Sequence, residues 1–117
     1  MNGCERMKYF LKESQRKEKG GTLYFEFQMG KFENKFWLKD SLCLHADIFD
    51  SLMLYELFTN VIEDFNYYSE NEVSQDQWRN IVAKSKENVQ WESVIEDLSS
   101  WVEECFMSHK CFTICGI

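Results

Sequence analysis

Four side chains near the carboxyl end of the chain are of the types that bind zinc: Cys105, His109, Cys111 and Cys115. Zinc prefers a tetrahedral set of cysteine and histidine ligands, and at a spacing of i, i+4 Cys105 and His109 would share one face of a helix. The run lacks the closely spaced cysteine pair of structural zinc sites, however, and a free cysteine usually packs as a small hydrophobic residue. We therefore expect buried, reduced thiols that hold no metal.

A histidine with two nearby carboxylates, His45, Asp47 and Asp50, is the second group that could do chemistry. General acid–base catalysis needs such groups to converge in a site shielded from water. These three residues fall instead where a helix is expected to begin, and an aspartate in a first helical turn interacts favourably with the helix dipole. The chain has two histidines, and the pair Gly20-Gly21 is not followed by the residues of a phosphate-binding loop. We predict that the protein is not an enzyme.

The charge changes sign along the chain. Residues 1–40 hold nine lysines and arginines against six acidic residues, a net charge of +3, whereas residues 41–117 hold four against fourteen, a net charge of −10. The bases of the first part are interleaved with Glu13 and Glu18, which is more typical of a solvated segment than of a phosphate-binding face. The acidic second part should repel nucleic acid and anionic membranes and attract basic proteins.

The densest run of acids lies between residues 63 and 76 and contains no lysine or arginine. Aromatic residues are interleaved with these acids. At protein interfaces aromatic side chains supply contact area, while charges supply steering and register. The same composition also suits a solvated face that keeps a protein in solution. As a hypothesis, we predict a partner-binding surface formed by Glu63, Asp64, Tyr67, Tyr68, Glu70, Glu72 and Asp76.

The elements that must position these groups follow from the spacing of apolar residues. Apolar and polar residues alternate over residues 22–29 and again over 32–39, separated by a glycine-lysine turn. This pattern predicts an antiparallel hairpin at residues 22–39 with one buried face that includes Phe25 and Phe27.

Beyond residue 41 the apolar period changes to that of a helix. A wide apolar stripe from Ile48 to Phe65 predicts a central helix that packs on the sheet. The polar segment 66–73 predicts a loop. Residues 4–19 fit either a helix or an edge strand, and both remain open.

Two further helices and a strand complete the predicted fold. Ser74 and Gln77 have the spacing of a capping box, which predicts that a short helix begins there. A second stripe over residues 94–106 predicts a strongly amphipathic helix, and residues 111–115 are rich in strand formers. Together these elements predict one α+β domain over residues 1–117, a small antiparallel sheet packed against three helices.

The cysteine content and the absence of apolar targeting segments suggest a compartment. The five cysteines are odd in number and lack a CxxC pair, which does not favour a disulfide framework. The first nineteen residues lack the layout of a signal peptide, and charged residues interrupt the most apolar stretch, residues 42–58. We expect a cytoplasmic protein.

As a whole, the chain resembles the CdiI-type immunity proteins of bacterial contact-dependent growth inhibition systems. The resemblance lies in its general character: a short acidic domain, acidic amphipathic helices, the aromatic segments 23–27 and 36–38, and the terminal residues 111–117. It implies a protein that binds and neutralises a cognate toxin domain, commonly a basic nuclease that acts on tRNA or DNA, without a cofactor. The alternative is an acidic regulatory or adaptor module that binds a basic endogenous protein.

Overall fold

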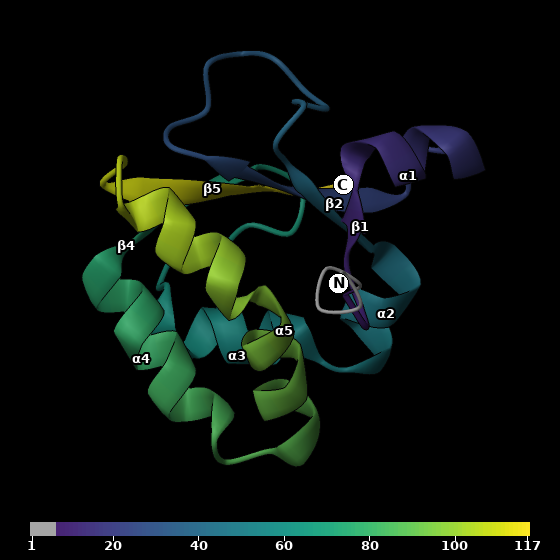
Figure 1. The fold of residues 1–117 in the computed structure, drawn as a ribbon. Coiled ribbons are helices and arrows are strands. Elements are labelled where there is room, and N and C mark those ends of the chain that lie inside the picture. The colour runs from purple at the N-terminus through teal and green to yellow at the C-terminus, as the bar shows by residue number, and fades with distance from the viewer. Residues whose placement is uncertain (1–6) are drawn as a thin grey trace, which may run out of the picture.

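The computed structural model describes residues 7–117, which form five strands and five helices (Figure 1). Cys4 and Arg6 lie outside the described residues. In chain order the elements are β1 (Leu11–Lys12), α1 (Glu13–Lys19), β2 (Tyr24–Met29), β3 (Leu42–His45), α2 (Ala46–Ser51), α3 (Leu54–Val61), β4 (Glu70–Ser74), α4 (Gln75–Ser85), α5 (Val89–Phe106) and β5 (Cys111–Cys115). The α+β class predicted from the sequence is confirmed.

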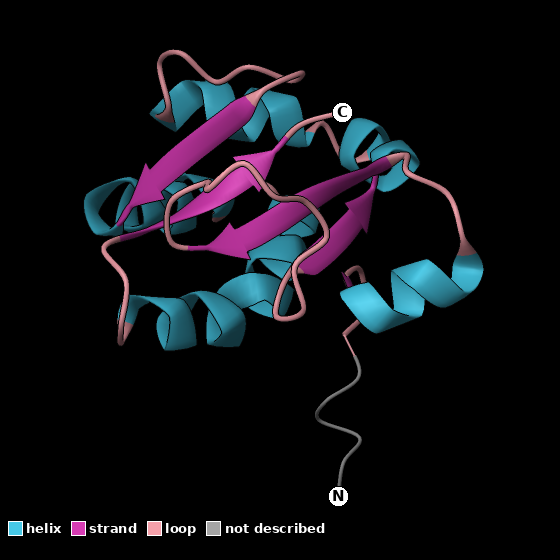
Figure 2. Ribbon diagram, turned by 90° about the horizontal axis from the view of Figure 1, so that it is seen from above, coloured by secondary structure: helices cyan, strands magenta, loops and turns pink. Residues whose placement is uncertain are grey.

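The strands form one antiparallel sheet in the order β1-β3-β2-β5-β4. Helices α3, α4 and α5 lie against one face, which we call the core face. Helix α1 and the long loop between β2 and β3 lie over the other face (Figure 1). In Figure 2, which looks onto that face, the loop crosses in front of the central strands. We call this second face the loop face.

Large aromatic rings fill the core between the sheet and the helices. Phe25 and Phe27 of β2 are fully buried, as predicted. Phe25 stacks on Phe49 of α2, with ring centroids 3.9 Å apart, and Phe27 lies 6.3 Å from Phe112 of β5. Such rings bury large apolar areas and favour offset or edge contacts, so the core is specified mainly by aromatic packing.

The predicted second strand over residues 32–39 is wrong. These residues form an irregular loop in which Asn34 and Trp37 have left-handed backbone angles, φ 66° and 61°. A β-strand cannot contain such residues, because its backbone requires negative φ. The true partner of β2 is β3, whose register pairs Phe25 with Leu44 and Phe27 with Leu42. The hairpin therefore exists, but its second strand begins at Leu42.

The prediction of a single buried face is also wrong for β2. Tyr24, Glu26 and Gln28, which point to the loop face, are buried as well. Both oxygens of the Glu26 carboxylate accept hydrogen bonds from the loop: the Trp37 N–H at 2.8 Å, the Leu38 N–H at 2.7 Å and the Ser41 hydroxyl at 2.7 Å. The loop is therefore fastened to the sheet by buried polar groups rather than by a strand ladder.

The ambiguous segment before β2 contains both a strand and a helix, since β1 leads directly into α1. On α1, Arg16 pairs with Glu13 at 2.7 Å, and its guanidinium lies over the Trp37 ring, 4.0 Å from the centroid. The hydrogen bonds and charge of Arg16 lower the pKa of Glu13 below its ordinary value. These contacts hold α1 against the loop.

The single central helix predicted from residue 48 to residue 65 is two helices, so three predicted helices become five with α1. Met53 separates α2 from α3 and has a left-handed backbone, φ 56°. The apolar stripe still predicts buried side chains correctly at Phe49, Leu57 and Phe58, which are all enclosed in the core. The break lets the chain change direction while each half keeps its apolar side on the core.

The predicted loop at residues 66–73 ends in a strand, β4. Its side chains alternate, with Asn71 and Val73 buried and Glu70 and Glu72 exposed. The predicted capping box is confirmed: the Gln77 N–H donates to the Ser74 hydroxyl at 3.2 Å, and the Ser74 N–H donates to Gln77 Oε1 at 2.9 Å. Helix α5 and strand β5 also lie where the sequence predicts them.

Candidate functional site

Two adjoining hollows open near the start of β4, and Tyr68 lines both of them. The tyrosine hollow, about 670 Å³ in volume, is lined by Tyr55, Asp64, Phe65, Asn66, Tyr67 and Tyr68. The carboxyl-terminal hollow, about 350 Å³, lies on the loop face between residues 22–24, the loop and the end of the chain. Its remaining lining residues are Glu26, Phe36, Trp37, Tyr68, Glu70, Cys115, Gly116 and Ile117.

Most of the large apolar side chains that the described residues expose gather in these hollows. The structure exposes eight such side chains within residues 7–117, and five of them line one or both hollows. Clustered exposed apolar groups mark interaction sites, whereas single ones are ordinary on a protein surface. The five are Leu23, Phe36, Tyr55, Tyr68 and Ile117, with Tyr68 the most exposed at 75%.

Tyr67 and Tyr68 have different environments, although the sequence predicted both as part of the partner-binding surface. Tyr67 is half-buried and packs edge-on against Phe25 and Phe49, with centroids at 5.0 and 5.7 Å. Its hydroxyl donates to Asp50 Oδ1 at 2.9 Å, and burial together with this bond raises the pKa of Tyr67 to about 12. Tyr67 therefore belongs to the framework, and Tyr68 is the ring that a partner can reach.

The segment that presents Tyr68 is fixed by amide side chains. Asn66 Oδ1 accepts from the Tyr68 N–H at 2.8 Å. The side-chain amide of Asn71, buried on β4, donates to the carbonyls of Asn66 at 2.9 Å, Ser69 at 3.0 Å and Ile114 at 3.2 Å. Because these bonds satisfy the turn internally, Tyr68 projects from a segment that is already ordered.

The end of the chain forms one wall of the carboxyl-terminal hollow. The Gly116 N–H donates to the Ser69 carbonyl at 2.9 Å, and the Ile117 N–H donates to the Tyr67 carbonyl at 3.0 Å. A Cβ on residue 116 would collide with the Tyr67 carbonyl oxygen, so this close approach requires glycine. Gly116 thus places Ile117 beside Tyr68.

Three acidic residues of the predicted surface lie in or beside the two hollows. Asp64 lines the tyrosine hollow and Glu70 lines the carboxyl-terminal hollow, while Glu72 projects from the loop face two residues further along β4. Within residues 7–117, no lysine, arginine or histidine forms an ion pair with any of these three acids. Of the residues that the structure describes, no basic side chain lines either hollow. Their charge is therefore available to a partner.

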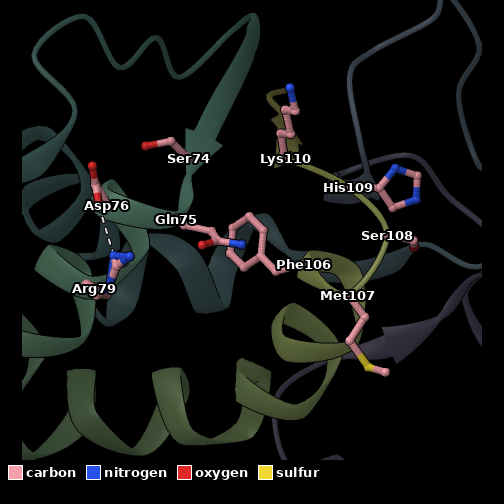
Figure 3. A pocket seen from close by; sticks show the side chains of 9 residues that line it. All are labelled: Ser74, Gln75, Asp76, Arg79, Phe106, Met107, Ser108, His109 and Lys110. Carbon is pink, nitrogen blue, oxygen red and sulfur yellow. Dashed lines mark hydrogen bonds and ion pairs between the residues drawn. The ribbon is translucent and has the colours of Figure 1, made fainter.

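Two predicted residues fall outside this arrangement. Glu63 is exposed but lines neither hollow. Asp76 lies at the start of α4, where it accepts a hydrogen bond from Arg79 at 2.8 Å. This pair lines a separate hollow of about 550 Å³. Figure 3 shows His109 and Lys110 on the opposite side of that hollow. The structure therefore brings together Asp64, Tyr67, Tyr68 and Glu70, with Glu72 alongside.

Four exposed apolar residues of the hollows were missed by the sequence reasoning: Leu23, Phe36, Tyr55 and Ile117. The sequence pattern assigned Leu23 and Phe36 to the buried face of a hairpin and Tyr55 to the buried stripe of a helix. For Phe36 a signal was present, because Asn34 interrupts the apolar alternation two residues earlier and asparagine is depleted in strands. The other three have no local signal, because only the fold brings them to the same surface.

The side chains of the four potential zinc ligands do not point toward a common site. Cys105 is buried in α5 and its thiol donates to the Cys111 carbonyl, with Sγ 3.4 Å from the oxygen, whereas His109 is exposed. Cys115 is buried on the loop face, and that burial raises its pKa to about 12, which keeps the thiol protonated. Among residues 7–117, no three histidine, cysteine, aspartate or glutamate side chains lie together as a metal site.

His45 acts as a helix cap rather than as part of a convergent acid–base group. Its Nδ1 accepts a hydrogen bond from the Asp47 N–H at 3.0 Å at the start of α2. The Asp47 carboxylate is exposed in the first turn, and Asp50 binds the Tyr67 hydroxyl. His45 and Asp50 therefore each have a structural partner in the fold, whereas the exposed Asp47 carboxylate lies 3.8 Å from His45 Nδ1.

Comparisons of this chain with models of protein families, with curated proteins and with solved structures found no match. Within residues 7–117, none of the helices combines the length and the apolar composition needed to cross a membrane.

Proposed function

We propose that this chain is an immunity protein of the CdiI type, which binds a basic toxin domain, such as a nuclease, and thereby neutralises it. The observation that carries the proposal is the gathering of five exposed apolar side chains in two adjoining hollows that no basic residue among residues 7–117 lines. Large exposed aromatic side chains beside acids suit a protein partner, and the resemblance of the chain supplies the kind of partner.

The chemistry of the surface supports a tight and selective contact. A projecting tyrosine is typical of the residues that dominate binding energy at interfaces, and the ordered turn around Tyr68 lowers the entropic cost of using it. Asp64, Glu70 and Glu72 add charge that favours a basic partner and disfavours an acidic one. A nuclease has a basic substrate cleft, so an acidic protein with an apolar anchor can occupy it.

The direct test is binding to the protein encoded immediately upstream, since an immunity gene should follow its toxin gene. We expect the two proteins to co-purify and the chain to protect cells from that toxin alone. In the purified pair, Tyr68→Ala and Phe36→Ala should each weaken binding by about 2 kcal/mol or more. Val89→Ala and Met107→Ala are matched controls, because both side chains are exposed but lie outside the two hollows.

Charge reversal provides a second test of the proposed binding surface. The triple variant D64K/E70K/E72K should lose protection while its circular dichroism spectrum is unchanged, because all three side chains are exposed. The control E96K/E103K/E104K changes the net charge equally on the exposed face of α5 and should still bind and protect. Equal effects of the two reversals would remove the assignment of the surface. Failure to bind or protect against the upstream toxin would remove the immunity function, and binding to a basic endogenous protein instead would favour the regulatory alternative.

A further inference from the structure

We propose that the carboxyl-terminal hollow is a binding site for a single arginine side chain of the partner. The inference deepens the proposed function by naming the group that this hollow recognises. A guanidinium on an apolar stem needs aromatic or aliphatic walls and a negative charge at its end. The hollow has both features.

The floor of the hollow is a row of three side chains on adjacent strands. In the sheet register, Cys115 of β5 lies directly between Glu26 of β2 and Glu70 of β4. Neighbouring strands are roughly 4.8 Å apart, so the two glutamate backbones lie about 10 Å apart and leave room between their side chains. All three side chains point to the loop face and line the hollow.

The two carboxylates differ in a way that suits one cation. Glu26 is 1% exposed, and its oxygens are held by the loop, so it is a fixed charge beneath the hollow. Glu70 is exposed and forms no ion pair with any of residues 7–117. Glu70 can therefore turn toward a guanidinium and pair with it, while Glu26 adds a charge that cannot move away.

The walls are built from side chains that pack well on a guanidinium and its stem. Phe36, Trp37 and Tyr68 provide aromatic rings, and Leu23 and Ile117 provide aliphatic surface. Arg16 already lies over the Trp37 ring at 4.0 Å, so the molecule itself contains the kind of contact that we propose. The volume of about 350 Å³ is sufficient for one long side chain and too small for a folded element.

The pairing also explains why the hollow discriminates against other groups. An acidic side chain would meet two negative charges, and burial keeps the Cys115 thiol between them neutral. A purely apolar side chain would leave Glu70 unpaired near the interface, which is unfavourable. An arginine side chain can pack its stem and guanidinium on the walls and pair its charge with the carboxylates of the floor.

The test uses a small probe, so that it does not depend on the toxin. N-acetyl-arginine methylamide is titrated into the protein up to about 50 mM and followed by NMR at the Trp37 indole and the Tyr68 ring, because a single side chain is expected to bind weakly. N-acetyl-citrulline methylamide, which has the same shape without the charge, is the matched probe. We expect saturable shifts at both residues with arginine and about tenfold weaker binding with citrulline.

Variants locate the site. Glu70→Gln and Tyr68→Leu should each weaken arginine binding by about fivefold or more, whereas Glu63→Gln, an exposed acid outside both hollows, should not change it. No saturable binding, equal affinity for citrulline, or insensitivity to Glu70→Gln would each overturn the inference. Arginine binding without protection against the upstream toxin would overturn the proposed function alone, and protection without arginine binding would overturn the inference alone.

Discussion

Glu26 is a glutamate in the middle of the central strand, and its carboxylate is almost fully enclosed. Its two oxygens accept three hydrogen bonds from the loop, two of them from main-chain N–H groups. A buried charge is costly unless hydrogen bonds replace the water that it loses. Here those bonds also hold Trp37 in its left-handed conformation, so one residue positions both the loop and a wall of the carboxyl-terminal hollow.

Glu26→Gln should therefore lower the free energy of unfolding by about 1–3 kcal/mol, because the new amide NH₂ faces N–H donors and leaves at least one of them unpaired. The measurement is chemical denaturation, together with hydrogen exchange at the amides of Trp37 and Leu38, which should become faster. Glu33→Gln, in the same loop but exposed, is the matched control and should change neither quantity. An unchanged stability of the Glu26 variant would contradict the fastening role.

At the scale of elements, periodicity predicted some elements correctly and others not: the wide apolar stripe over residues 48–65 belongs to two helices, and the alternating run over residues 32–39 forms no strand. Helix α5, helix α4 with its capping box and strand β5 follow directly from the sequence. Strand β4 was missed, because its composition is polar and its stability comes from pairing with β5, which lies far along the chain. Whether such a polar segment forms a strand depends on its pairing with a distant segment, so its own residue types say little about it.

The candidate site illustrates the same limit. Its acids and Tyr68 lie in one short stretch of sequence and were predicted together. Leu23, Phe36 and Ile117 join them only because β2, the loop and the end of β5 meet on one face of the sheet. No spacing rule relates residues so far apart in the chain. The sequence therefore predicted part of the site but not the walls that turn it into a hollow.

The break between α2 and α3 can be tested by replacing Met53 with glycine. The sign of the resulting change in the free energy of unfolding distinguishes two helices from one. Met53 has φ 56° and its side chain is 57% exposed, so it pays the steric cost of a left-handed residue with little packing in return. Met53→Gly should raise the free energy of unfolding by up to about 1 kcal/mol, because glycine adopts this backbone without strain.

In a continuous helix the same change would cost about 1 kcal/mol relative to a good helix former. Urea denaturation separates the two outcomes. Met53→Ile serves as the opposite control, since a β-branched residue tolerates positive φ poorly and should destabilise the protein. Destabilisation by glycine would mean that residues 46–61 form one helix.

At the scale of the whole molecule, the excess of acidic residues lies in the second part of the chain, but the two signs of charge meet on the loop face, where Glu70 and Glu72 lie on the same side of the sheet as α1 and the loop. Helix α1 and the loop, which carry most of the basic residues among residues 7–40, lie together over the loop face (Figure 1). The net −10 of residues 41–117 is spread over the helices, β4 and the connecting turns. A basic partner is therefore drawn to the acidic part at long range, while the hollows supply the contacts at short range.

Most acidic residues of the second part of the chain lie outside the two hollows, so steering and contact should be separable by mutation. Raising NaCl from about 50 to 500 mM should lower the association rate with the upstream toxin domain by about tenfold or more, with a smaller effect on dissociation. E96K/E103K/E104K should slow association and leave dissociation nearly unchanged, because these acids lie outside the hollows. Tyr68→Ala should speed dissociation and leave association nearly unchanged, since an uncharged side chain stabilises the bound complex but does not steer the encounter. Stopped-flow or surface plasmon resonance kinetics measure both rates. An association rate that is independent of salt would show that the acidic charge of this molecule does not serve partner recognition.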